Sequence, residues 1–326
     1  MFFALYGSLR KKTEPTMTYS IRSVKITALA LALAFTALAQ QRNKEDAGAP
    51  HPIKPANWVD PDKTGPPGSH YATFSSKLAK SDVSCLVYLP PDYETATDKR
   101  YPVVYWLHGL NGIQRAGAKF VTQLDRFTRE GKAPAMIVVM VNGMRDSFYN
   151  DSPDGKWPIE SVIIKELIPH VDQTYRTIAK RETRGVESFS MGGYGAGHLG
   201  FKYPEVFGMV GVMSGALIPV ESISAPNLVS IFKKMFGSDA AYFDANHPMA
   251  LARKNADAIR GRTAIRIAVG GDDNLLSRDK ALHDLLTELK IESEWEVVPG
   301  VPHNSTLFYD KLGDHAFAWY LKALSR

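Results

Sequence analysis

The chain has 326 residues, 44% of them apolar, which is enough to bury the core of one α/β domain without assuming a second domain. Its formal charge of +5 does not indicate a nucleic-acid or membrane partner, because most of the excess lies in the first 39 residues. Those residues hold five Lys or Arg and one Glu, so the remaining 34 basic and 33 acidic residues leave the rest of the chain nearly neutral.

The segment that begins at Met17 is typical of a secretory signal peptide. Two basic residues, Arg22 and Lys25, precede an apolar run over residues 26–39 that ends in Ala-Leu-Ala. The run is shorter than the roughly 20 residues that cross a bilayer, so cleavage is favoured over a membrane anchor. We therefore expect residues 1–39 to be removed from a secreted or periplasmic protein that has no membrane contact afterwards.

Residues 40–69 are polar and rich in proline, which predicts an extended, poorly ordered lead-in to a folded domain over residues 70–326. In that domain, short β-rich apolar runs predict buried strands, and longer segments with helical spacing separate them. This alternation predicts an α/β fold with a mostly parallel central sheet and flanking helices. We expect strands at residues 84–89, 103–107, 136–141, 186–189, 210–213, 265–269 and 295–298, and helices at residues 120–130, 159–175, 195–203, 280–290 and 309–323.

Residues 214–264 interrupt this alternation, because about fifty residues are too many for a plain crossover loop. The spacing of Leu228, Ile231 and Met235 predicts helices inserted above the edge of the sheet. Such an insertion could roof a substrate pocket or could pack only on the domain, and the sequence leaves both interpretations open.

A serine lies where a short apolar strand meets a glycine-rich helix start, in the sequence VESFSMGGYG over residues 186–195. An elbow of this kind holds the Ser190 hydroxyl at the carboxyl end of the sheet, in front of the N–H groups of the helix. The expected pattern is G-x-S-x-G, and Ser188 stands where the first glycine belongs, whereas Gly192 is present. A serine fits if its backbone stays extended, so Ser190 is the candidate nucleophile. Taken alone, the stretch could also be a helix start without chemistry.

A second strand runs into a glycine-containing loop in the sequence VYWLHGLNG over residues 104–112. In folds with this kind of elbow, that loop supplies one N–H of the oxyanion hole and the residue after the nucleophile supplies the other. We therefore expect the backbone N–H groups of Leu110 and Met191 to hold the oxyanion, with about 3–4 kcal/mol per donor. His108 at the strand end could be a base, but a structural role in fixing the loop is favoured.

The acid and the base are expected after Ser190 in chain order, each in a loop after a late strand. His303 follows the expected strand at residues 295–298 and would take the proton of Ser190. Asp272 and Asp273 follow the strand at residues 265–269, and we favour Asp273 as the residue that orients His303, although either carboxylate could instead cap the next helix. No cluster has metal-ligand spacing, so we expect no metal and no cofactor.

Three motifs in this order resemble the esterase family related to esterase D, which includes feruloyl and acetyl xylan esterases of carbohydrate esterase family 1, S-formylglutathione hydrolases and the antigen 85 mycolyltransferases. The resemblance covers roughly residues 55–325 and implies an α/β-hydrolase catalytic domain without a metal. It assigns Ser190 as nucleophile, Asp273 as acid and His303 as base, with Leu110 and Met191 as oxyanion donors, and Ser188 departs from the usual glycine. The motifs are LPPDY at residues 89–93, YPVVYWLHG at residues 101–109 and SMGGYG at residues 190–195.

The expected function is that of a secreted serine carboxylic ester hydrolase that forms an acyl-enzyme, acting on feruloyl or acetyl esters of plant polysaccharides or on small-molecule esters. Glutathione chemistry is cytoplasmic, so the export signal disfavours an S-formylglutathione hydrolase. A siderophore esterase of the enterochelin type, an acyltransferase, or a non-catalytic binding protein on a hydrolase scaffold remain alternatives, because fold alone does not fix function.

Overall fold

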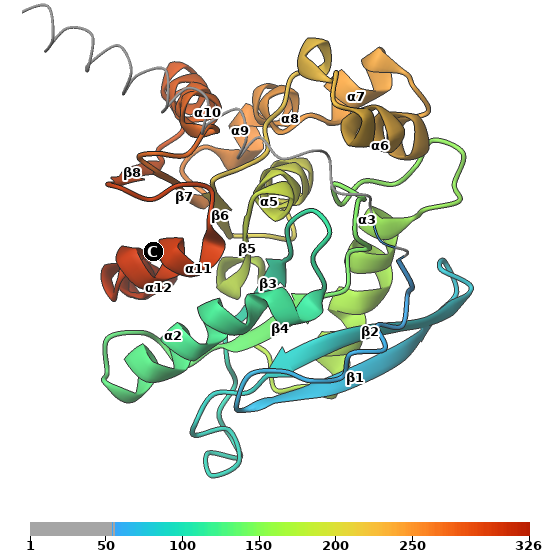
Figure 1. Cartoon of the computed structure of the whole chain (residues 1–326). Coiled ribbons are helices and arrows are strands. Elements are labelled where there is room, and N and C mark those ends of the chain that lie inside the picture. Colours follow the sequence, from blue (N-terminus) through green and yellow to red (C-terminus); the bar gives the residue numbers. More distant parts are fainter. Residues whose placement is uncertain (1–53, 55) are drawn as a thin grey trace, which may run out of the picture. The chain divides into compact units, whose positions relative to one another are not determined.

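The computed structural model describes residue 54 and residues 56–326. The expected signal peptide lies outside the described residues, as do residues 40–53 of the lead-in. The described part is built on one eight-stranded sheet in the order β1-β2-β4-β3-β5-β6-β7-β8 (Figure 1). Its strands are β1 (Ser69–Ser76), β2 (Ser81–Tyr88), β3 (Val103–Leu107), β4 (Ile137–Val141), β5 (Arg184–Phe189), β6 (Met209–Met213), β7 (Ala264–Gly270) and β8 (Glu294–Val298).

The strands from β4 to β8 in this order run parallel, and β1 and β2 join them antiparallel. The prediction of a mostly parallel α/β-hydrolase sheet is therefore confirmed. The strand β1 was not predicted, because its mixed polar sequence does not form an apolar run. Of the predicted buried strands, β8 is only half-buried, because it pairs with β7 on one side alone and forms an edge of the sheet.

Helices cover both faces of the sheet (Figure 1). Alternate residues of β3 show the two layers: Tyr105 packs in one apolar core with α5, and Trp106 packs in the other with α2, α11 and α12. The helices are α2 (Ala118–Arg129), α3 (Ile159–Val162), α4 (Ile168–Thr174), α5 (Met191–Lys202), α6 (Pro226–Phe236), α7 (Ala240–Asn246), α8 (Pro248–Lys254), α9 (Ala256–Ile259), α10 (Leu276–Glu288), α11 (Ser305–Leu312) and α12 (His315–Leu324). In the described residues, no helix combines the length and the apolar character needed to cross a bilayer.

Two helices that were predicted as continuous are interrupted. The first contains a π-helical turn over Ile163–Leu167 between α3 and α4, next to Pro169, which lacks an N–H for the helical ladder. The second is divided into α11 and α12 at Gly313, whose φ of 69° ends the first helix. In each case the apolar spacing continues across the break, so periodicity alone does not reveal it.

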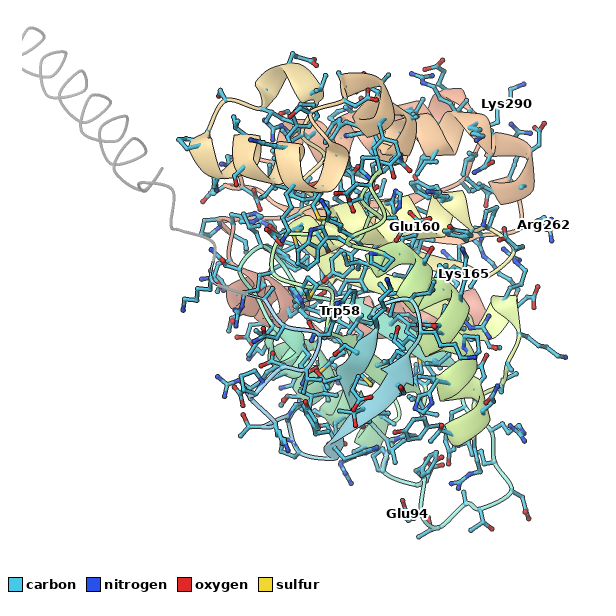
Figure 2. The ribbon with its side chains drawn as sticks, turned by 90° about the vertical axis from the view of Figure 1, so that its right-hand side faces the viewer. Trp58, Glu94, Glu160, Lys165, Arg262 and Lys290 are labelled. Atoms are coloured by element: carbon cyan, nitrogen blue, oxygen red, sulfur yellow. The ribbon has the colours of Figure 1, made fainter. Side chains whose placement is uncertain are left out.

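The described part of the lead-in is held against the domain, whereas its composition favours a loose segment. The backbone N–H of Ser84 in β2 donates to the carbonyl of Trp58 at 2.9 Å, and the N–H of Asp60 donates to Ser84 Oγ at 2.9 Å. The side-chain amide of Asn142 also donates to the carbonyl of Trp58, a residue labelled in Figure 2, at 2.9 Å. These bonds attach the segment to β2 and to the loop after β4.

The residues between β6 and β7 form the predicted helical insertion, α6 to α9. The helix α8 packs along α5, and the side chains of α6 and α7 close over an apolar cavity of their own. Only apolar side chains line this cavity: Phe148, Ile218, Ile223, Leu228, Ile231, Phe232, Phe236 and Phe243.

The junction between β5 and α5 depends on Gly192. A Cβ on this residue would lie 2.2 Å from Ser188 Oγ and 2.3 Å from the Leu107 carbonyl oxygen. Ser188, which stands where the motif has glycine, is fully buried in β5 and fills the space in front of Gly192. The helix therefore approaches the sheet closely in spite of Ser188, because the second glycine of the motif is retained.

Glu160, labelled in Figure 2, lies in α3, and its contacts connect that helix to α5 and, through the His198 ring, to α7. Its carboxylate lies 2.7 Å from His198 Nε2 and 2.9 Å from Lys202 Nζ, and it accepts a hydrogen bond from the Tyr203 hydroxyl. The other nitrogen of the His198 ring lies 2.8 Å from the carbonyl of Asn246. Burial alone would raise the pKa of Glu160, but these donors outweigh burial and lower it to about 2.

Replacing Glu160 with Gln should lower the free energy of unfolding at pH 7 by about 1–3 kcal/mol, because the half-buried Lys202 loses its anionic partner and the donors around residue 160 lose a carboxylate acceptor. A carboxylate with a lowered pKa stabilises the fold above the pKa of the unfolded state, and this contribution is lost as the pH falls through the folded value. The difference in the free energy of unfolding between wild type and Glu160→Gln, measured with a denaturant, should therefore shrink as the pH falls from 4.5 to 2. The lower limit is the pKa of Glu160 in the folded state, which is about 2. The exposed Glu205→Gln is the control, and a difference that does not change with pH would contradict the interpretation.

Gly192→Ala should lower stability by about 1–3 kcal/mol through overpacking. The double variant Ser188→Gly with Gly192→Ala should recover only part of the loss, because the contact with the Leu107 carbonyl remains. Thermal unfolding of the two single variants and the double variant measures this. Ser188→Gly alone should cost no more than about 1 kcal/mol, and an unchanged midpoint for Gly192→Ala would refute the packing argument.

Candidate active site

Ser190 lies between the last residue of β5 and the first residue of α5. Its backbone has φ 64° and ψ −124°, a conformation that residues with a Cβ rarely adopt. Hydrogen bonds hold it there: its N–H donates to the carbonyl of Met213 at 3.0 Å, and its carbonyl accepts from the N–H of Ala216 at 2.9 Å. The elbow therefore presents the serine side chain at the carboxyl end of the parallel strands.

Two further side chains form a hydrogen-bonded series with Ser190. His303 Nε2 lies 2.9 Å from Ser190 Oγ, and His303 Nδ1 lies 2.8 Å from Asp273 Oδ2. The other carboxylate oxygen of Asp273 accepts from the N–H of Leu275 at 2.9 Å. Burial alone would raise the pKa of Asp273, but the hydrogen bonds from His303 and Leu275 outweigh burial and hold the pKa below its usual range. The carboxylate is thus charged and fixed beside the imidazole.

The two adjacent aspartates occupy different environments. Asp273 is buried and contacts His303, whereas Asp272 is exposed and its backbone N–H donates to the carbonyl of Val301. The structure therefore brings Asp273, and not Asp272, to the histidine. Neither side chain is the N-cap of the following helix, which is Leu275.

The position of His303 is fixed from both sides. Its ring packs on Phe189, with ring centroids 4.8 Å apart. The next residue, Asn304, is the N-cap of α11 and accepts from the N–H of Leu307 at 3.0 Å. The His303 side chain is 35% exposed, so a proton donor or acceptor in solution can reach the ring.

The loop after β3 lies against the nucleophile. A Cβ on Gly109 would lie 3.4 Å from the Ser190 Cβ, at van der Waals contact, so the loop and the nucleophile are direct neighbours. In the part of the chain that the structure describes, neither the Leu110 N–H nor the Met191 N–H donates to a backbone carbonyl. Met191 is the first residue of α5, where helical N–H groups have no partner within the helix. Neither group thus has a backbone acceptor among the described residues, as the predicted role of oxyanion donor requires.

His108 connects this loop to the loop after β4. Its Nδ1 lies 2.9 Å from the carbonyl of Gly109, and its Nε2 accepts from the N–H of Gly143 at 3.3 Å. Burial lowers the pKa of His108 to about 4, so the ring is neutral at pH 7. The carbonyl of His108 also accepts from the Tyr149 hydroxyl at 2.9 Å. The geometry agrees with the structural role that the sequence favours, and not with a role as base.

A solvent-open hollow exposes the hydroxyl of Ser190. Its walls come from the loop after β3, from the elbow and from the loop after β8, and none of its lining residues belongs to the insertion. The insertion, which could have roofed the pocket, covers its own apolar cavity instead. In the residues that the structure describes, no three His, Cys, Asp or Glu side chains gather as metal ligands. The lining residues are Gly109, Leu110, Phe189, Ser190, His303, Asn304, Ser305 and Thr306.

Sequence reasoning missed the turn after β6. Residues 214–216, here called the 214–216 turn, bind the backbone of Ser190 through Ser214 and Ala216, and Ser214 itself has a positive φ of 43°. The sequence places these residues directly after a predicted strand, but backbone contacts leave no pattern of residue types. The ring contact between Phe189 and His303 was also missed, because the sequence pattern assigned Phe189 only to a strand.

Comparisons with known proteins agree with this architecture. A family model described as "Putative esterase" matches residues 75–326. An endo-1,4-β-xylanase/feruloyl esterase of Xylanibacter ruminicola is 32% identical over 166 residues, which are 48% of this chain and 23% of that protein, so the chain matches less than a quarter of this relative. An acetyl esterase of Caldicellulosiruptor saccharolyticus is 26% identical over 76% of this chain and 96% of its own length.

Among solved structures, a ferulic acid esterase superposes with a TM-score of 0.67 at 24% identity, over 78% of this chain and 98% of its own. At that identity the likeness supports the fold alone. The match to the family model spans most of the chain, and it confirms the family resemblance of the sequence motifs. The chain belongs to the esterase family of serine hydrolases with the α/β-hydrolase fold.

Proposed function

We propose that the protein is a serine carboxylic ester hydrolase in which Ser190 is the nucleophile, His303 the general base and acid, and Asp273 the residue that orients His303. The observation that carries this proposal is the series of hydrogen bonds from Asp273 through His303 to Ser190. A serine hydroxyl is a weak nucleophile until an adjacent base takes its proton, and the base needs a fixed orientation.

In the first half of the reaction, Ser190 Oγ attacks the ester carbonyl carbon as His303 Nε2 takes the hydroxyl proton. The negative oxygen of the tetrahedral intermediate accepts from the N–H groups of Leu110 and Met191. The intermediate then collapses, and the alcohol leaves with the proton from His303, so that Ser190 carries the acyl group. The charged Asp273 stabilises the imidazolium during this step.

In the second half, water enters the open hollow and attacks the acyl carbon. His303 takes a proton from this water, the Leu110 and Met191 N–H groups hold the second oxyanion, and the proton passes to Ser190 Oγ as the acid is released. The exposure of His303 supports this step, because water can reach the imidazole without movement of a lid.

We further propose that the substrates are feruloyl or acetyl esters of plant polysaccharides and that the enzyme is secreted or periplasmic. The signal-peptide pattern of residues 17–39 supports export. The names of two relatives, a xylanase/feruloyl esterase and an acetyl esterase, support the acyl groups. An exported enzyme meets esters of polymers that do not enter the cell.

A second hollow supports an extended, hydroxyl-rich alcohol. It adjoins the first, since Thr306 lines both, and the two have volumes of about 620 and 590 Å³. Each is within the range of roughly 300–1,000 Å³ that is typical of ligand sites. The second hollow contains two cations that are already paired: Lys119 Nζ lies 2.5 Å from Asp310 Oδ1, and Arg115 lies 3.3 Å from Asp62. Paired charges and threonine hydroxyls suit a neutral sugar better than an ionic ligand.

We propose that the second hollow takes the alcohol part of the ester. His303 returns the proton to the alcohol oxygen, so the alcohol must lie beside His303 during that step. Thr306 follows His303 by three residues in α11 and leads from the first hollow into the second. A sugar attached to the ester oxygen would therefore extend across Thr306 toward Lys119 and Arg115.

Ser190→Ala should reduce the hydrolysis of nitrophenyl acetate and methyl ferulate by about 10⁴-fold or more, and Asp273→Asn by about 10³–10⁴-fold. Ser190→Ala removes the nucleophile, and Asp273→Asn removes the carboxylate that orients the imidazole. Steady-state kinetics measure both. Asp272→Asn is the matched control and should change the rate less than about threefold; equal rates for wild type and Ser190→Ala would exclude the proposed nucleophile.

Thr122→Trp should obstruct the second hollow and leave the first one open. We expect kcat/KM for a feruloylated arabinoxylo-oligosaccharide to fall about fivefold or more, since a few hydrogen bonds of about 0.5–1.5 kcal/mol are lost. For methyl ferulate it should stay within about twofold. For acetyl esters, the same comparison uses an acetylated xylo-oligosaccharide, for which kcat/KM should fall, and nitrophenyl acetate, for which it should not.

The exposed Thr97→Trp, which lines neither hollow, is the control for a surface tryptophan. An equal effect of Thr122→Trp on the oligosaccharide and methyl esters would exclude the sugar subsite and leave the ester hydrolase assignment intact.

A further inference from the structure

Asp279 is a buried carboxyl group that the proposed mechanism does not use. It lies in the first turn of α10 and has no solvent exposure. Its Oδ1 accepts from the backbone N–H of Gly215 at 2.9 Å, and its Oδ2 has no hydrogen-bond partner in the described part of the chain. A fully buried aspartate that forms no ion pair, as Asp279 forms none among the described residues, is rare, so the position requires an explanation.

A role in the stability of α10 does not account for this contact. An acidic residue in the first turn of a helix interacts favourably with the helix dipole, and Asp279 has such a position. Its hydrogen bond, however, joins it to Gly215, which is 64 residues away in the chain and belongs to another loop. The side chain thus connects two elements rather than capping one.

Gly215 belongs to the 214–216 turn, which binds both backbone groups of Ser190. The Ser190 N–H donates to the carbonyl of Ser214 at 3.1 Å as well as to Met213, and the N–H of Ala216 donates to the Ser190 carbonyl at 2.9 Å. The strained φ of Ser190 persists only if its neighbours hold it. A displacement of the turn would therefore move the nucleophile.

The 214–216 turn cannot move far unless Asp279 or the elbow at Ser190 moves as well. A Cβ on Gly193 in α5 would lie 2.9 Å from the Gly215 Cα, so helix and turn are in close contact. On the other side, a Cβ on Gly215 would lie 3.0 Å from Asp279 Oδ1. The turn is enclosed between α5, which begins directly after the nucleophile, and the carboxyl group of Asp279.

We propose that Asp279 is a positioning residue, which holds the 214–216 turn against Ser190 through the N–H of Gly215 and so keeps the Ser190 hydroxyl directed at His303. The inference rests on the proposed role of Ser190 as nucleophile and extends it. The side chain touches no reacting atom and acts only through the turn.

The hydrogen bond to Gly215 decides which substitution preserves this role. Burial, more than the nearby Asp273 carboxylate, raises the pKa of Asp279 well above its usual range, which favours the uncharged form of the side chain. Asparagine keeps one oxygen acceptor and the size of the side chain. Asn should therefore replace Asp at this position, and Ala should not, because the Gly215 N–H then loses its acceptor.

The test compares kcat, KM and the rate of labelling by a fluorophosphonate for wild type, Asp279→Ala and Asp279→Asn. We expect Asp279→Ala to lower kcat and the labelling rate by about 10- to 100-fold, as for a small misplacement of a reacting group. KM should change less than about threefold, and Asp279→Asn should keep at least about a third of both rates.

Leu282→Ala is the matched control, because Leu282 is buried on the same helix and does not bind the turn. It should lower thermal stability without the loss in kcat. If Asp279→Ala retains the kcat of Leu282→Ala, or if Asp279→Asn is as slow as Asp279→Ala, the positioning role is excluded.

Gly215→Ala provides a second route if Asp279→Ala does not fold, because its Cβ would press on Asp279 Oδ1 and on Val212, which lies 2.8 Å away. It should also lower kcat and labelling, and wild-type rates for this variant would overturn the inference. A failure of the proposed function would give another result: wild type and Ser190→Ala would then have equal kcat and equal labelling rates, whatever residue stands at position 279.

Discussion

The strained backbone of Ser190 is the constraint on which the rest of the site depends. A positive φ at a residue with a Cβ costs of order 1–3 kcal/mol, so the surrounding structure must supply that energy. Gly192 and Gly193 leave no side chain between α5 and its neighbours, and the 214–216 turn binds the N–H and the carbonyl of Ser190. The close packing at this junction is therefore part of the chemistry, since it determines where the hydroxyl lies.

The parallel sheet explains how residues more than a hundred positions apart come together. The strands β5, β6, β7 and β8 are neighbours in this order, so their carboxyl ends lie side by side along one edge. Ser190 follows β5, Asp273 follows β7 and His303 follows β8. The strand β6, between them, supplies no side chain to the hydrogen-bonded series, but the 214–216 turn that follows it holds the nucleophile in place.

Much of this arrangement could be predicted from the sequence, and what could not has a physical reason. Ser190 and His303 have recognisable neighbours, because an elbow and a loop after a strand require particular residue types. Asp279 has no such signal, since its function depends on a contact with a backbone N–H 64 residues away. The choice between Asp272 and Asp273 also depended on loop geometry, which directs one carboxylate inward and leaves its neighbour in solvent.

The hollow at Ser190 has walls made of short loops and is not covered by the helical insertion. An ester bond in an insoluble fibre is immobile, so it cannot diffuse into a tunnel or wait for a lid to open. An enzyme that acts on such a bond must bring its own reactive atom to a solid surface. A serine at the mouth of an open hollow can make that contact, so the position of the described insertion away from Ser190 would suit the proposed action on plant polysaccharide esters.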